Sequence, residues 1–85
     1  MIRIAAIIVL YNPEMNRLHE NIMAVYDQVD EVHLIDNTSN NIASIKEKYK
    51  NNKKISFQCN NTNCGIAKAL NQGFEYFFGI DMKME

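Results

Sequence analysis

Three polar segments rich in asparagine follow three short apolar runs, and they hold most of the side chains that could do chemistry. They are Tyr11-Asn12, Asp36-Asn37-Thr38-Ser39 and residues 60–65. Asp36 is the one carboxylate among them. An acid at the end of a strand in a parallel sheet commonly accepts a hydrogen bond from the sugar or base of a nucleotide. Asp36 is equally well explained as a cap for the next helix, so this residue alone does not decide the function.

The hydrophobic pattern predicts three strands that alternate with three helices. The first run is apolar at nearly every position, as is typical of a strand covered on both faces. The predicted strands cover residues 2–10, 31–35 and 54–59, and the predicted helices cover residues 13–28, 42–49 and 65–78. This βαβαβα order predicts parallel strands joined by right-handed crossovers. Because ligands of such sheets bind outside the carboxyl ends of the strands, the polar segments are candidate site residues.

The helix ends have their own signals. We expect Asn12 to be the N-cap of the first helix, with Pro13 at its first position and Glu14 in its first turn. Gly79 is expected to end the third helix. The third helix has its apolar stripe at Ile66, Leu70, Phe74 and Phe77, with Tyr76 and Phe78 beside it. This is more apolar surface than one small sheet can bury, so a partner or further chain should cover it.

Length and composition limit the function classes. The 85 residues predict a single domain spanning 1–85, and the net charge of −1 argues against a nucleic-acid partner. The longest apolar run, residues 4–11, is far short of the ~20 residues of a membrane span. Cys59 and Cys64 are expected to be free thiols of a cytoplasmic protein, and no metal site is assigned. Neither a Gly-x-Gly-x-x-Gly nor a Walker loop is present.

The same polar segments resemble motifs of family 2 glycosyltransferases, which have the GT-A fold. Ile7-Ile8-Val9-Leu10-Tyr11-Asn12-Pro13 is similar to the first strand and turn of that family. Leu34-Ile35-Asp36-Asn37-Thr38-Ser39 resembles its second motif, and Asn63-Cys64-Gly65-Ile66-Ala67-Lys68-Ala69-Leu70-Asn71-Gln72-Gly73 resembles its third. The Tyr-Asn-Pro turn and the Gly-Ile-Ala core are most similar to the rhamnosyltransferase-like branch. The resemblance covers about residues 2–81.

The resemblance implies a three-layer, Rossmann-like α/β half of a GT-A nucleotide-diphospho-sugar transferase fold, truncated, with a parallel sheet. Tyr11 would stack on a uracil or thymine ring, and Asp36 would accept a hydrogen bond from the base or ribose. Lys68 and the N-terminus of the third helix would approach the diphosphate. The residues expected to bind the nucleotide-sugar are Tyr11, Asn12, Asp36, Asn37, Ser39, Asn63, Gly65 and Lys68.

Simpler explanations stand beside these roles. Tyr11 could be a plain strand-end aromatic residue and Lys68 a solvated lysine. Asn63 could be only the N-cap of the third helix, and Asn71 and Gly73 only packing residues. His19 and His33 are expected to be surface or strand histidines.

The family pattern continues with an Asp-x-Asp motif that holds Mg²⁺ or Mn²⁺ and a carboxylate general base. Asp81 and Glu85 do not have that spacing, so we assign neither metal ligands nor catalytic residues in this chain. We expect a fragment that binds a UDP- or dTDP-sugar donor, including dTDP-rhamnose, and is inactive alone in transfer to a glycan. The alternative is a non-enzymatic α/β oligomerisation or interaction module. A third and weaker hypothesis is another doubly wound nucleotide-binding fold with different ligands. In either main case we expect a homo-oligomer, formed through the third helix or the sheet edges.

Overall fold

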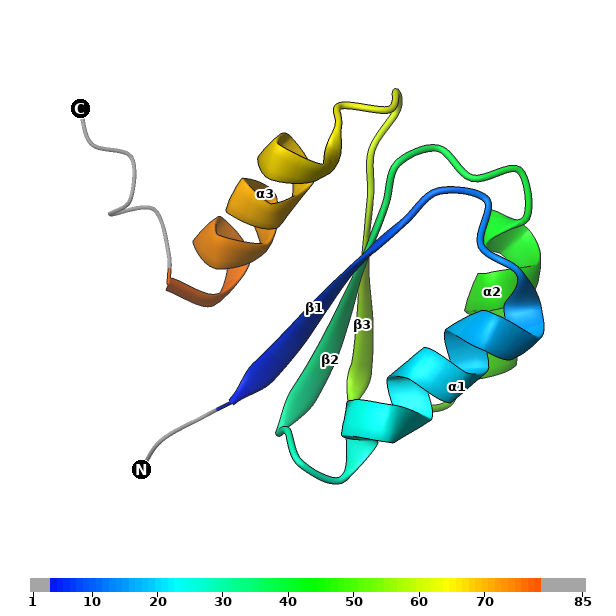
Figure 1. Cartoon of the computed structure of the whole chain (residues 1–85), viewed down its shortest axis with the longest axis vertical. Helices are drawn as coiled ribbons and strands as arrows, with labels where there is room; N and C mark the ends of the chain where they lie inside the picture. The colour runs from blue at the N-terminus through cyan, green and yellow to red at the C-terminus, as the bar shows by residue number, and fades with distance from the viewer. Residues whose placement is uncertain (1–3, 79–85) are drawn as a thin grey trace.

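A parallel sheet lies between helices, as the alternating pattern predicts (Figure 1). The computed structural model describes residues 4–78. Its elements are β1 (Ala5–Leu10), α1 (Met15–Tyr26), β2 (Glu31–Asp36), α2 (Ile42–Tyr49), β3 (Ile55–Cys59) and α3 (Ile66–Phe78). The strand order is β1-β2-β3, and both neighbouring pairs are parallel. The α/β class and the order of elements are therefore confirmed.

Most predicted boundaries agree with the structure to within one or two residues. The second strand extends one residue further than expected, so Asp36 is its last residue instead of the first residue of the loop. The first helix is shorter at both ends than the predicted range of 13–28. The expected strand start at Ile2 and the helix stop at Gly79 lie outside the described residues.

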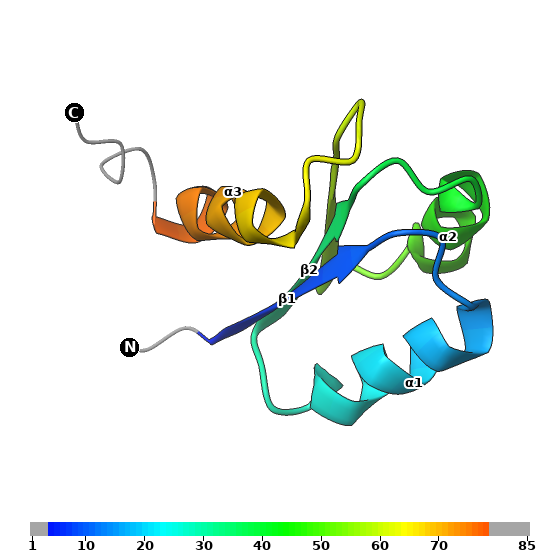
Figure 2. The same cartoon turned by 45° about the horizontal axis from the view of Figure 1, so that its top comes forward.

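The helices form two layers, one on each face of the sheet (Figure 2). α1 and α2 cover one face, and the main core fills the space between them and the sheet. Its buried members are Leu10, Leu18, Ile22, Val32, Leu34, Ile45, Tyr49 and Ile55. Each fully buried aliphatic side chain of this size contributes about 1.5–3 kcal/mol. β2 is the central strand, so its alternate residues His33 and Ile35 are buried on the other face, under α3.

α3 packs on the sheet through its small residues. Ala69 is fully buried, and a Cβ added at Gly73 would lie 2.8 Å from Ile7 Cδ1 and 3.1 Å from Ile35 Cδ1. The packing role considered for Gly73 is thus confirmed, whereas Asn71 is exposed. The large residues of the predicted stripe are exposed: Ile66 is 68% exposed, Leu70 39% and Phe74 48%. The side chain of Phe77 lies outside the described part.

The predicted start of α1 is wrong in detail. Glu14 is the N-cap residue, and its carboxylate accepts hydrogen bonds from the backbone N–H groups of Asn16 at 2.9 Å and Arg17 at 3.0 Å. These two bonds hold the pKa of Glu14 below its ordinary value. Asn12 has a left-handed φ of 47°, and its side chain bonds to another loop instead of capping the helix. Pro13 consequently precedes the cap.

His33 is a buried strand histidine, as the simpler explanation had it. Its Nδ1 lies 2.7 Å from Ser56 Oγ, and the Ser56 hydroxyl donates to Glu31 Oε2 at 2.6 Å. The imidazole also stacks on the ring of Tyr76, with centroids 4.0 Å apart. A buried polar side chain needs such partners, so the network stabilises the contact between the sheet and α3.

Candidate functional site

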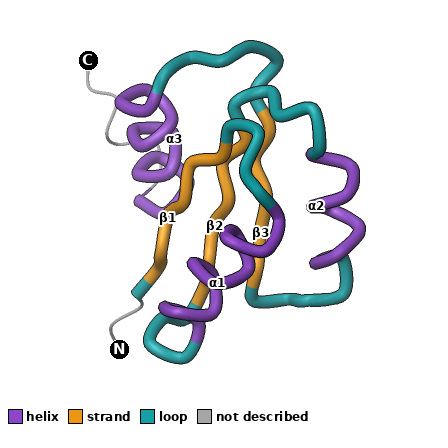
Figure 3. Tube along the Cα trace, turned by 45° about the vertical axis from the view of Figure 1, so that its right-hand side comes forward, coloured by secondary structure: helices purple, strands orange, loops and turns teal. Residues whose placement is uncertain are grey.

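The three strands end in one row, and this register brings the polar segments together. Leu10 is the partner of Asp36, and Asp36 is the partner of Cys59. The backbone N–H of Asn37 donates to the Leu10 carbonyl, and that of Asn60 donates to the Asp36 carbonyl, both at 2.8 Å. The loops that follow β1, β2 and β3 therefore leave the sheet side by side at its carboxyl edge (Figure 3).

Hydrogen bonds join the loops after β1 and β2. The Asn12 backbone N–H donates to Ser39 Oγ at 2.7 Å, and Asn12 Oδ1 accepts from the Asn40 N–H at 2.7 Å. The Asn41 side-chain amide donates to the Pro13 carbonyl at 2.8 Å. Asn12 and Ser39, both expected at the site, therefore hold its two loops in a fixed relative position.

Asp36 supports the turn that follows it. Its side chain is only 1% exposed, and its Oδ2 accepts from the backbone N–H of Ser39 at 3.0 Å. The explanation as a cap of the second helix is wrong, because α2 begins at Ile42 and its N-cap residue is Asn41. A carboxylate oxygen can accept more than one hydrogen bond, so a ligand contact by Asp36 remains a prediction.

Asn37 belongs to a cluster of buried or half-buried polar side chains that also contains Asn60, Cys64 and Gln72, here called the amide cluster. Asn37 is 2% exposed, and its Oδ1 accepts from Asn60 Nδ2 at 2.7 Å and from Cys64 Sγ at 3.2 Å. Its Nδ2 donates to the Gly65 carbonyl at 3.3 Å. Asn37 thus fastens the loop after β3 to the end of β2.

The loop after β3 is shaped by Asn63 and Gly65. Asn63 Oδ1 accepts from the backbone N–H of Gly65 at 2.9 Å, and Gly65 has a left-handed φ of 84°. Gly65 directly precedes α3, and its carbonyl accepts the first helical bond, from the Ala69 N–H. The alternative explanation of Asn63 as only the N-cap of α3 is therefore wrong, because its side chain closes a tight turn with Gly65, before the helix begins at Ile66.

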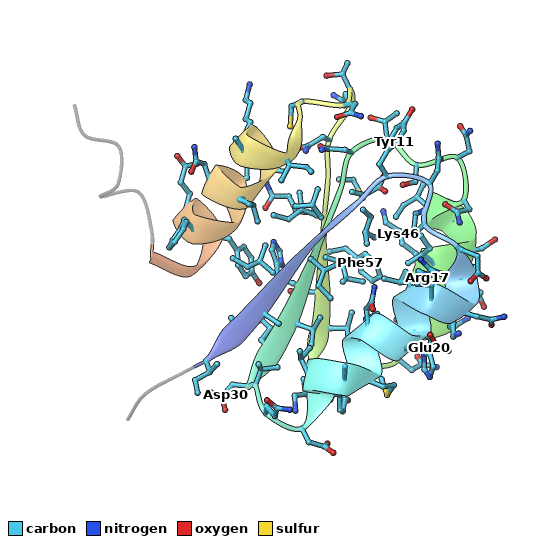
Figure 4. The ribbon with its side chains drawn as sticks, viewed as in Figure 1. Tyr11, Arg17, Glu20, Asp30, Lys46 and Phe57 are labelled. Carbon is cyan, nitrogen blue, oxygen red and sulfur yellow. The ribbon has the colours of Figure 1, made fainter. Side chains whose placement is uncertain are left out.

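Four of the expected side chains are exposed at this edge: Asn12, which bonds to the loop after β2, and Tyr11, Asn63 and Lys68. Tyr11 is 58% exposed, at the end of the molecule where the three loops meet (Figure 4). Asn63 and Lys68 are exposed on the third loop and the first turn of α3. Nothing lies within 4 Å of a Cβ built on Gly65, so the space beside this glycine is open. A ligand at the edge would therefore meet one aromatic ring, one ammonium group and an open stretch of backbone.

Left-handed backbone occurs once in each of the three loops. Besides Gly65, two residues of the described chain have a positive φ: Asn12 at 47° and Thr38 at 70°. Such a conformation is unfavourable for a β-branched residue like Thr38. Strained backbone tends to gather at functional sites, where neighbouring contacts maintain it. Of the three residues, Thr38 is the strained one, because asparagine and glycine tolerate this conformation, and it lies in the loop that directly follows Asp36.

Residues 4–78 contain no group of three or more His, Cys, Asp or Glu side chains placed to hold a metal ion. The side chains described here therefore do not fit an Mg²⁺ or Mn²⁺ site by themselves. Asp81 and Glu85 lie outside the described residues. Asn60 was expected at this edge as part of the polar segment 60–65, but its bond to Gln72 was not, because no local pattern marks two amides twelve residues apart as partners.

Comparison with known proteins decides the family. The model for "Glycosyl transferase family 2" matches residues 5–79 of the chain, which include all three loops. The chain belongs to glycosyl transferase family 2. This family 2 chain is also 38% identical over 73 residues to the dTDP-rhamnosyl transferase RfbF of Shigella flexneri.

The alignment with RfbF covers 86% of the chain but 24% of that protein, so the chain spans about a quarter of its relative's length. No solved structure gives a significant match. The expected resemblance to the rhamnosyltransferase-like branch is confirmed. Among the described residues of this family 2 chain, no helix is long and apolar enough to cross a membrane.

Proposed function

We propose that this family 2 segment binds the nucleotide of a UDP- or dTDP-sugar donor, including dTDP-rhamnose, for transfer to a glycan acceptor. The observation that carries the proposal is the common register of the strand ends, which places Tyr11, Asp36 and the Asn63–Gly65 turn at one edge. The similarity to a protein named dTDP-rhamnosyl transferase supports the choice of donor.

Each exposed group at the edge suits one part of such a donor. The Tyr11 ring is a free face on which a pyrimidine base can stack. The N-terminus of α3 attracts anions because the first N–H groups of a helix have no acceptor within the helix, and Lys68 lies in the same turn. Gly65 allows a diphosphate to approach the backbone closely, since no side chain fills the space. Asp36 is buried in contrast to these groups, and we propose that its carboxylate accepts a hydrogen bond from the base or ribose at the inner end of the site.

For the whole transferase, we propose that Mg²⁺ or Mn²⁺ offsets the charge of the leaving diphosphate and that a carboxylate takes the acceptor proton. Neither group is assigned to the described residues. We therefore expect this segment alone to bind nucleotide without transferring sugar. Because both cysteines are free thiols, we place it in the cytoplasm.

A second function is favoured by one observation, the exposed apolar stripe of α3. Ile66, Leu70 and Phe74 expose apolar side chains on α3, and exposed apolar surface of this kind is typical of an interaction or oligomerisation module. A nucleotide-binding segment can use the same stripe to contact a second copy. Nucleotide titration distinguishes a donor site from a purely structural module.

The proposal is tested by titrating dTDP-rhamnose, UDP-glucose and, as a purine control, ADP-glucose into the ¹⁵N-labelled chain. We expect amide shifts at Tyr11, Asp36 and Gly65 with the two pyrimidine donors, and weaker effects with ADP-glucose. Tyr11→Ala should weaken binding by roughly 3- to 10-fold, because aromatic stacking contributes about 0.5–1.5 kcal/mol.

The matched control is Phe74→Ala, which removes an exposed ring about two turns along α3. This variant should bind the donors as the unchanged chain does. The absence of shifts at millimolar donor, or equal losses in both variants, would contradict a nucleotide site at this edge.

A further inference from the structure

The amide cluster connects three parts of the chain through one side chain. Asn60 Nδ2 donates to Asn37 Oδ1 at 2.7 Å and to Gln72 Oε1 at 3.0 Å, and it lies 3.3 Å from Cys64 Sγ. An amide nitrogen has two protons, so it satisfies two of these acceptors. The Cys64 thiol is then free to donate its proton to Asn37 Oδ1 at 3.2 Å. Asn60 thereby joins the end of β2 to the second turn of α3.

The backbone of Asn60 is fixed as firmly as its side chain. Its N–H donates to the Asp36 carbonyl at 2.8 Å, and its carbonyl accepts from Thr38 Oγ1 at 3.1 Å. Asn60 therefore contacts the turn after Asp36 as well as the third loop. A shift of this residue would move both segments that the proposed site uses.

The edge thus divides into two groups of residues. Tyr11, Asn63 and Lys68 are exposed and can touch a ligand. Asn60 and Gln72 are half-buried and bond to other protein groups, so they act through the residues they hold.

We propose that Asn60, with Gln72, is a positioning residue that sets the distance between the Asp36 turn and the Asn63–Gly65 loop, and so the fit of the nucleoside diphosphate. This inference rests on the proposed function and adds residues to that same site. Both protons of the Asn60 amide are needed, because its two acceptors are oxygens. A carboxylate of the same shape has no proton to donate, so its oxygen would repel the side-chain oxygens of Asn37 and Gln72. This repulsion would separate the loop from β2 and α3.

The test compares Asn60→Asp with Asn61→Asp, which adds the same charge one residue away on an exposed side chain. Both are made in a Cys59→Ser background, so that Cys64 is the remaining thiol. Two quantities are measured: the Kd for dTDP and UDP, and the rate of Cys64 modification by a disulfide reagent. Far-ultraviolet circular dichroism checks that each variant is folded.

Cys64 modification should be faster in Gln72→Ala than in the parent, because this change loosens the cluster without placing a carboxylate, which would disfavour the reactive thiolate, beside Cys64. We expect Asn60→Asp to raise the Kd about tenfold relative to Asn61→Asp, because the loop separates from β2 and α3. Gln72→Ala, which removes one acceptor at a half-buried position, should show a smaller change in the same direction. It keeps the test decisive if Asn60→Asp does not fold.

Equal affinities in the Asn60→Asp and Asn61→Asp variants, or equal thiol rates in Gln72→Ala and the parent, would overturn the positioning role while leaving the nucleotide site intact. A parent chain that binds neither dTDP nor UDP contradicts the proposed function instead. In that case the cluster loses its nucleotide role whatever the thiol rates show.

Discussion

At the scale of single residues, Thr38 shows how the edge maintains an unfavourable conformation. Its φ of 70° is unusual for a β-branched side chain and costs roughly 1–2 kcal/mol. The bond from Thr38 Oγ1 to the Asn60 carbonyl and the bond from the Ser39 N–H to Asp36 hold the turn in place. These two hydrogen bonds offset part of the conformational cost at Thr38. The strained turn lies where we propose that the donor binds.

Thr38→Asn should increase the free energy of unfolding by about 0.5–1 kcal/mol, because asparagine tolerates left-handed backbone. Thr38→Val keeps the strain and removes the hydroxyl, so it should lower stability by about 0.5–1 kcal/mol. Urea denaturation followed by circular dichroism measures both changes.

Thr62→Asn provides the control, since Thr62 is exposed and has no positive φ. It should leave stability nearly unchanged. If Thr38→Asn proves no more stable than Thr62→Asn, the strain at Thr38 is not present in solution.

At the scale of elements, the contact between α3 and the sheet depends on the absence of a side chain at Gly73. Two atoms of Ile7, Cδ1 and Cγ2, would lie 2.8 and 2.9 Å from an added Cβ. A glycine within a helix normally costs roughly 0.5–1 kcal/mol relative to alanine. Here the packing that the close approach of α3 and the sheet allows outweighs the conformational cost of Gly73.

Gly73→Ala should therefore destabilise the chain, by about 1–2 kcal/mol, although the same change stabilises most helices. Combining it with Ile7→Val, which removes Cδ1, should reduce the loss, and a double-mutant cycle by thermal unfolding measures this coupling. A Gly73→Ala variant more stable than the parent would show that α3 does not pack in this position.

At the scale of the whole molecule, two features favour association with a second copy. Ile66, Leu70 and Phe74 expose apolar surface on α3, and β1 is an edge strand of six apolar residues without a charge. An uncharged edge strand readily pairs with another chain. The homo-oligomer proposed above would cover one or both of these surfaces.

Sedimentation velocity should show dimers or larger species whose fraction rises with concentration. Leu70→Lys and Phe74→Lys should shift the chain toward the monomer, because a lysine on the stripe would have to be desolvated. Met23→Lys on α1, which is 42% exposed, is the matched control and should leave association unchanged. A chain that remains monomeric at every concentration contradicts the proposal.

The order of elements, the parallel sheet and the positions of the polar loops follow from the sequence. Hydrophobic periods and turn residues are local signals, so the alternation of the apolar runs was enough to predict β1 to α3. The three motifs predicted the family correctly for the same reason. Each is a short stretch at a strand end, readable without knowledge of its neighbours in space.

Contacts between distant parts of the chain were decided by the tertiary structure. The side-chain oxygen of Asn12 accepts from the backbone N–H of Asn40, 28 residues away, and therefore does not cap α1. Asn37 and Asn60, 23 residues apart, bond to each other, although the sequence indicated only that Asn37 is a candidate ligand-binding residue and Asn60 a polar loop residue. The packed face of α3 was also decided by the structure: Gly73 was considered as a packing residue, but the burial of Ala69 and the exposure of the large stripe were not expected, because two small residues can approach a sheet more closely than large ones. Periodicity finds a helix, but which of its faces is buried depends on the shape of the surface it meets.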